Sequence, residues 1–141
     1  MKRVVIKEEL VALTGDWLSA AILDKLLCLS ERTREIDDYL EKERRKAESG
    51  GWHDIVDALD QIPPRQGWTY KTLSELVEEL VQCAAGNSIR LRIKELVDKG
   101  FLQERNNPHD ALDRTLQYQP NVTFIQQELA KLGYVLEGYR R

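Results

Sequence analysis

The chain has 141 residues, of which 42% are hydrophobic and 32% charged, and its formal net charge is −3. This length allows one compact core, or one small domain with an appended helix, and the composition is typical of a soluble globular protein. The acidic balance argues against broad, non-specific DNA binding, which requires a basic surface that releases counterions. No apolar run approaches the ~20 residues that span a bilayer, and no signal peptide is apparent. We therefore expect a cytoplasmic protein without a membrane partner.

Residues 1–51 predict a short helix followed by a long one. The run VVIKEELVAL at 4–13 begins extended and becomes helical. Gly15 interrupts it because glycine takes positive φ at little cost, and Asp16 is suited to cap the helix that follows. That helix starts at Trp17, and its first half is apolar on several sides. We expect this half to be the buried centre of the core, and both cysteines to be buried free thiols.

The second half of the long helix is highly charged and allows two interpretations. One is a solvated helix held by ion pairs between residues four apart. The other is packing on a second copy, because an apolar residue continues to recur every three or four positions, as in a coiled-coil seam. The second interpretation predicts a homodimer, with dimerisation residues at Leu29, Ile36, Tyr39 and Leu40.

A connector at 52–66 follows, with an amphipathic helical turn or two and then two prolines that enforce an extended chain. Residues 67–71 alternate and are rich in β-formers, which predicts a short strand. Thr72 and Glu75 have the spacing of a capping box, so a helix is expected from Thr72 to about Gln82. The three tryptophans, Trp17, Trp52 and Trp68, are interpreted either as core residues or as interface anchors.

Small residues at 83–86 predict a tight turn, with Gly86 able to take a left-handed conformation. Asn87 or Ser88 is expected to cap the next helix, which ends at Gly100. Its buried stripe comprises Ile89, Ile93, Leu96 and Val97. Projection at about 100° per residue places Leu91, Lys94, Glu95 and Asp98 on the opposite face.

Two strands are expected next, at 101–105 and 114–119, joined by the turn-forming residues 106–110. Leu102, Leu116 and Tyr118 are predicted to face the core. Thr123 and Gln126 have the spacing of a second capping box, and Gly133 suits the end of the last helix. The apolar part of the tail, 134–136, is expected to pack back on the domain.

This order of elements is the plan of a mainly α fold with a small β-hairpin, a winged helix-turn-helix preceded by a long N-terminal helix. It divides the chain into an N-terminal helical segment at 1–51, a connector at 52–66 and a winged-helix domain at 67–141. The segments GWTYKTLSELVEEL and SIRLRIKELVDKGFLQERNNPHDALDRTLQY resemble the winged-helix module of replication-initiation or replisome-organiser proteins of bacterial phages and mobile elements. The resemblance implies DNA binding, with replication proteins as further partners.

Catalytic and metal-binding patterns are not evident. His53 and His109 lie in separate predicted loops, the cysteines lack C-x₂-C spacing, and no glycine-rich phosphate loop is present. The adjacent acidic pairs on the helices point about 100° apart and therefore form no carboxylate dyad. We expect a protein that is not an enzyme and carries no cofactor or metal.

The predicted function is double-stranded DNA binding in replication initiation or transcription regulation. The helix that ends at Gly100 would enter the major groove and the hairpin would follow the backbone. The candidate contacts are Lys71, Asn87, Ser88, Arg90, Leu91, Arg92, Lys94, Arg105, His109 and Arg114. The alternative is an adaptor that docks another protein on the same face, because Leu91, Glu95 and Asp98 are poor phosphate ligands. For Arg114, pairing with Asp113 or Glu104 is the competing interpretation.

Overall fold

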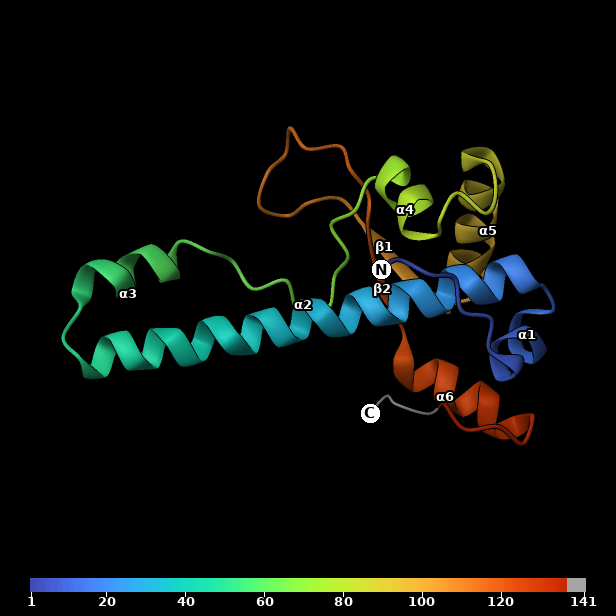
Figure 1. The fold of residues 1–141 in the computed structure, drawn as a ribbon, viewed down its shortest axis with the longest axis horizontal. Coiled ribbons are helices and arrows are strands. Elements are labelled where there is room, and N and C mark those ends of the chain that lie inside the picture. The colour runs from blue at the N-terminus through green and yellow to red at the C-terminus, as the bar shows by residue number, and fades with distance from the viewer. Residues whose placement is uncertain (137–141) are drawn as a thin grey trace.

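The structure is a computed structural model that describes residues 1–136, and it is mainly helical with one two-stranded antiparallel hairpin. The long helix α2 crosses the whole molecule, with α4, α5 and the hairpin on one side of its first half and α6 on the other (Figure 1). The elements are α1 Glu8–Thr14, α2 Trp17–Ser49, α3 His53–Asp60, α4 Leu73–Glu79, α5 Gly86–Asp98, β1 Leu102–Arg105, β2 Gln117–Pro120 and α6 Val122–Lys131.

The start of α2 is specified by its own local sequence. Gly15 has φ 77° and closes α1, and the Asp16 carboxylate accepts a hydrogen bond from the Ser19 amide at 3.0 Å, as expected for an N-cap. The first half of α2 is buried, which confirms its predicted place at the centre of the core. Trp17, the first residue of the helix, is an exception because it is 47% exposed.

A single hydrophobic cluster holds the domain together. It draws side chains from α1, α2, α4, α5, both strands and α6, so residues before and after the connector share one core. Its largest fully buried members are Leu10, Ile22, Leu23, Leu26, Leu27, Leu80, Ile89, Leu96, Ile125 and Leu129. Leu136 is also buried and Tyr134 packs on the cluster, whereas Val135 is exposed. The predicted packing of the tail is therefore confirmed for two of its three apolar residues.

The second half of α2 leaves this core as an arm, and α3 lies alongside it (Figure 1). The Arg44 Nε atom contacts the Asp60 carboxylate at 2.6 Å and so joins the two helices. Ala47 is buried where the chain turns from α2 into α3, and the Trp52 amide donates to its carbonyl. The connector therefore contains two turns of helix, as the sequence predicted, and it covers one side of α2.

Helix α4 is shorter than predicted, because it ends at Glu79 and not at about Gln82. The capping box of Thr72 and Glu75 is confirmed. After Leu80 turns into the core, Val81 and Gln82 both adopt left-handed backbone conformations, with φ 57° and 53°, and Val81 is exposed. The chain reverses at these two residues. The chain therefore does not need the left-handed conformation that was predicted to be possible at Gly86.

Two capping predictions for later helices were wrong. Helix α5 begins at Gly86, with Ala85 as an N-cap that makes no side-chain bond, so neither Asn87 nor Ser88 caps it. Helix α6 is capped by Asn121, whose side-chain oxygen accepts from the Phe124 amide at 3.1 Å, and not by Thr123. The turn after α4 fixes where α5 begins, and the end of β2 fixes where α6 begins.

The predicted strand at 67–71 is reduced to one bridge, in which the Thr69 amide donates to the Tyr118 carbonyl at 2.8 Å. Residues 65–67, which precede this bridge, are held by α2 in a conformation that is not extended. The Asp37 carboxylate accepts from the Arg65 and Gln66 amides, and Gly67 follows with φ 86°. A chain in that conformation cannot continue the ladder in both directions.

The hairpin pairs Leu102 with Pro120 and Arg105 with Gln117. This register makes the second strand shorter than predicted and leaves residues 106–116 as the hairpin loop. Leu102 and Tyr118 face the core as expected, but Leu116 belongs to the loop and is 39% exposed. Gly133 has φ 84° and the Tyr134 amide bonds the Leu129 carbonyl, which confirms the predicted glycine stop after α6.

Neither cysteine is in a disulfide, as expected, but they are not buried. Cys28 is half-buried on α2 and Cys83 is exposed in the loop before α5. The exposure of Cys83 follows from the early end of α4, which places residues 81–83 on the surface. Among residues 1–136, no helix combines the length and the apolar character needed to cross a membrane.

Candidate nucleic-acid interface

A groove of about 500 Å³ lies between α4, α5 and the hairpin. Its floor is apolar and its edges are charged, and it is formed by residues far apart in the sequence. Leu73 and Leu76 come from α4, Ile93 and Val97 from α5, and Tyr118 from β2. Helices α4 and α5 and the hairpin therefore line one concave surface.

Four of the predicted DNA-binding residues line this groove. They come from three separate segments of the chain: Lys71 precedes α4, Arg90 and Lys94 lie on α5, and Arg114 lies on the hairpin loop. Lys71 pairs with the largely buried Glu79 at 3.6 Å, and Arg90 donates to the Asn87 side chain. Within residues 1–136, Lys94 and Arg114 make no ion pair.

Acidic groups at the same edges moderate the positive charge. Asp98 on α5 and Glu104 on β1 line the groove with the four cations. Burial, together with the nearby Glu104 carboxylate, raises the pKa of Tyr118 to about 12. The charges that face the groove add up to a modest positive excess, with four basic and two acidic side chains.

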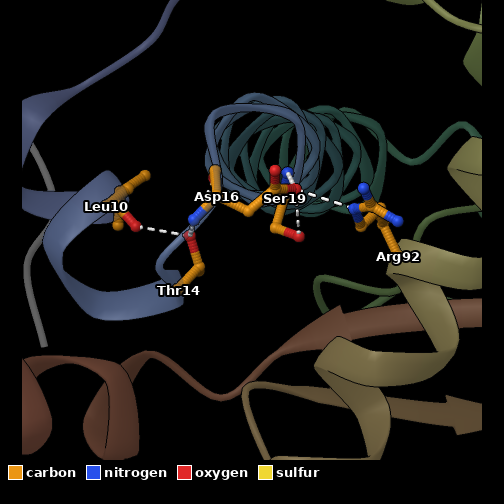
Figure 2. A network of polar contacts seen from close by, with 5 residues as sticks. All are labelled: Leu10, Thr14, Asp16, Ser19 and Arg92. Carbon is orange, nitrogen blue, oxygen red and sulfur yellow. Dashed lines mark hydrogen bonds and ion pairs between the residues drawn. The ribbon is translucent and has the colours of Figure 1, made fainter.

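Arg92 has another role, because it joins α5 to the beginning of α2 (Figure 2). Its Nε atom donates to the Asp16 carboxylate at 2.7 Å, and the same carboxylate oxygen accepts from the Ser19 amide and hydroxyl at 3.0 Å each. The Arg92 guanidinium is the main cause, and the Ser19 amide the next, of an Asp16 pKa below its ordinary value of 3.8. The predicted DNA contact at Arg92 thus already has a partner within the chain.

The network at Asp16 continues to α1 through Thr14. The Thr14 hydroxyl donates to the Leu10 carbonyl at 2.8 Å, and Figure 2 shows these residues in line from α1 to α5. This arrangement joins α1, α2 and α5 at one point. Sequence reasoning missed it because 76 positions separate Arg92 from Asp16.

Arg105 likewise stabilises the base of the hairpin. Its guanidinium lies over the Trp68 ring at 4.2 Å from the ring centre, and its Nε atom donates to the Gln117 side chain at 2.8 Å. Gln117 is almost fully buried, so this hydrogen bond satisfies a polar group that would otherwise be orphaned. Trp68 is half-buried by the same contact.

The hairpin loop is ordered by short-range hydrogen bonds from asparagine and aspartate side chains. Asp113 accepts from the Thr115 amide at 2.9 Å and from the Asn107 side chain at 3.1 Å, and these bonds, the first above all, lower its pKa. The His109 amide donates to the Asn107 side chain, and His109 is exposed at the tip of the loop. Asp113 is thus engaged within the loop, and Arg114 remains exposed beside it.

The other predicted contacts lie along α5. Asn87 is exposed at its first turn, Ser88 is half-buried, and Leu91 is 58% exposed. The predicted dimerisation residues are divided between two environments. Leu29 is buried in the core and Leu40 is half-buried against the connector, whereas Ile36 and Tyr39 are exposed.

In the part of the chain that the structure describes, no three His, Cys, Asp or Glu side chains are grouped so that they could hold a metal ion. The chain matches no model of a protein family, no curated protein and no solved structure.

Proposed function

We propose that this chain is a winged-helix protein that binds double-stranded DNA through α5 and the hairpin loop. The order that supports this is a core helix, two helices joined by a short turn, and a hairpin directly after the second of these helices. In such an arrangement the second helix of the pair enters the major groove and the hairpin contacts the adjacent backbone. The resemblance of 67–121 to replication-initiation modules agrees with this assignment.

The observation that carries the proposal is the convergence of Lys71, Arg90, Lys94 and Arg114 on one groove. Phosphate contacts supply most of the affinity of a DNA-binding protein and fix its register, and lysine and arginine make them. Arg92 and Arg105 then have supporting roles, because they fix the positions of α5 and of the hairpin. The setting we propose is the cytoplasm of a host cell, in replication initiation or transcription regulation of a phage or mobile element.

A salt titration with duplex DNA tests this proposal. Arg90, Lys94 and Arg114 make no ion pair within residues 1–136, and three phosphate contacts predict that log K falls with log salt with a slope of about −2.7. Replacing both Arg90 and Lys94 by alanine should reduce that slope by about two. The matched control is Lys42→Ala with Arg45→Ala, which removes the same charge from the arm of α2. Absence of binding near 50 mM salt would refute DNA binding.

A second candidate function is docking of another protein in the same groove. The specific observation in its favour is the apolar floor, formed by Leu73, Leu76, Ile93 and Val97, which DNA phosphates would leave unused. An adaptor of this kind would retain its partner at high salt, because apolar contacts are not screened. Binding of duplex DNA that disappears by 200 mM salt favours the first function.

We also propose that the chain acts as a homodimer. The support is the arm formed by α2 and α3, which extends beyond the core (Figure 1). Large apolar side chains are exposed on this arm. Two copies would present two winged helices to one DNA molecule. Sedimentation at tens of micromolar tests this proposal, and a monomer at that concentration would refute it.

A further inference from the structure

The arm of α2 carries a stripe of side chains on the side away from α3. At about 100° per residue, positions 36, 39, 43, 46 and 50 lie within about 80° of one another. Helix α3 and the end of the connector lie next to Leu40, Glu41 and Arg44, whose positions are centred about 130° from this stripe. The stripe therefore remains largely exposed in the single chain, although Ile36 also lines a pocket with Arg65 and Tyr70. We call it the arm stripe.

Both ends of the arm stripe are apolar. Ile36 is 45% exposed and Tyr39 is 62% exposed at the end nearest the core. At the far end, the Trp52 indole lies against Gly50, where a Cβ atom would be 3.4 Å from the ring, and Trp52 is 60% exposed. Exposed aromatic side chains of this size are typical anchors of protein interfaces.

The middle of the arm stripe carries one charge of each sign. Glu43 and Lys46 lie between the two apolar ends, with 3.5 Å between the Glu43 carboxylate and the Lys46 ammonium. From the core outward, the stripe is therefore apolar, acidic, basic and apolar. Read in the opposite direction, the order is apolar, basic, acidic and apolar. Each charge of one copy would therefore face the opposite charge of an antiparallel second copy, as contact between two identical surfaces across a two-fold axis requires.

We propose that a second copy of this chain packs antiparallel on the arm stripe, with the two-fold axis between residues 43 and 46. Glu43 then faces Lys46 of the second copy, and Tyr39 packs on Gly50 and Trp52 of the second copy. This arrangement rests on the proposed homodimer and specifies its surface and direction. It differs from the coiled-coil seam predicted by the sequence, because Leu29 and Leu40 are occupied by the chain's own core and connector.

Charge reversal tests the antiparallel arrangement with purified full-length chain. Glu43→Lys and Lys46→Glu each place two like-charge contacts in the interface, so each should raise the dissociation constant of the dimer at least about tenfold. An equimolar mixture of the two variants restores both opposite-charge contacts, and should sediment as a dimer where each variant alone is a monomer. Asp38→Lys is the control, since position 38 lies outside the arm stripe.

Tyr39→Ala and Trp52→Ala test the apolar ends and should also weaken the dimer. The outcomes distinguish between the homodimer, the arm stripe and the antiparallel direction. A wild-type monomer at tens of micromolar refutes both the homodimer and the arm stripe. A dimer that is indifferent to Glu43→Lys refutes the arm stripe alone, and failure of the mixture to dimerise refutes the antiparallel direction. Duplex binding by the monomeric variants reports on DNA binding independently of the dimer.

Discussion

The Nε atom of Arg92 lies 2.7 Å from the Asp16 carboxylate, so the residue that caps the central helix also holds the helix we propose for DNA contact. The two residues are 76 positions apart in the sequence. Their contact means that the orientation of α5 depends on the start of α2. A change at Asp16 therefore affects both the stability of the core and the position of α5.

Removing the Asp16 side chain should destabilise the protein more than removing that of Arg92. Asp16→Ala eliminates both the N-cap and the ion pair, and the loss of the cap alone costs about 1 kcal/mol. Arg92→Ala leaves the cap bonds to Ser19 intact, and its partly exposed ion pair contributes less. Urea unfolding of the two variants measures the difference. Equal losses would show that the cap contributes little.

Acid should weaken the protein through Asp16. Its pKa is lowered in the folded chain, so its contribution to stability is fully present above the ordinary value of 3.8 and disappears as the pH falls through the folded value. The free energy of unfolding of Asp16→Asn, which keeps a capping oxygen, should depend less on pH below 4 than that of the wild type. Unfolding curves at pH 7, 4 and 3 test this, and parallel losses would exclude Asp16 as a cause.

Gly67→Ala should cost more stability than Gly15→Ala. Both glycines have positive φ, which costs an alanine about 1 kcal/mol. At Gly15 nothing lies within 4 Å of an added Cβ, whereas at Gly67 the Cβ would lie 2.7 Å from Arg34 Nε and 2.8 Å from Gln119 Nε2.

Gln119 would have to move, and its hydrogen bond to the Gln66 carbonyl would be lost, which adds about 1 kcal/mol. Thermal unfolding of the two variants side by side gives the comparison. A smaller loss at Gly67 than at Gly15 would contradict the close approach of these side chains.

Leu91→Lys should strengthen duplex binding. Leu91 is 58% exposed on α5 and can be replaced without loss of core packing. An added cation at this position would contact one more phosphate and make the salt slope steeper by about 0.9. Leu132→Lys, at a 51% exposed position at the end of α6 on the other side of α2 (Figure 1), shows whether any added charge has the same effect. If Leu91→Lys leaves DNA binding unchanged, this face of α5 does not meet DNA.

The features that the sequence predicted well depend on neighbours within four residues. Asp16 as N-cap, the box of Thr72 with Glu75 and the stop at Gly133 are such cases. The predictions at Thr123 and at 67–71 were wrong because a competing group decided the outcome. Asn121, two residues before Thr123, caps α6 instead. The hydrogen bonds that Asp37 accepts from Arg65 and Gln66 direct the chain before Thr69 away from the sheet.

The candidate site was predicted in part. The resemblance and the helix pattern pointed to Lys71, Arg90, Lys94 and Arg114, which the fold places on one groove. They also included Arg92 and Arg105, whose partners Asp16, Gln117 and Trp68 are distant in the sequence. A charge pattern along one helix cannot distinguish a cation that faces solvent from one that is already paired across the fold.

Because α2 continues without a break from the core to the end of the arm, its length fixes how far the end of the arm lies from the core. Its 33 residues span about 50 Å at ~1.5 Å each. In an antiparallel pair joined between residues 43 and 46, the two cores, centred near Leu27, would stand about 50 Å apart. The length of one helix would therefore set the distance between the two groove-bearing cores of the dimer.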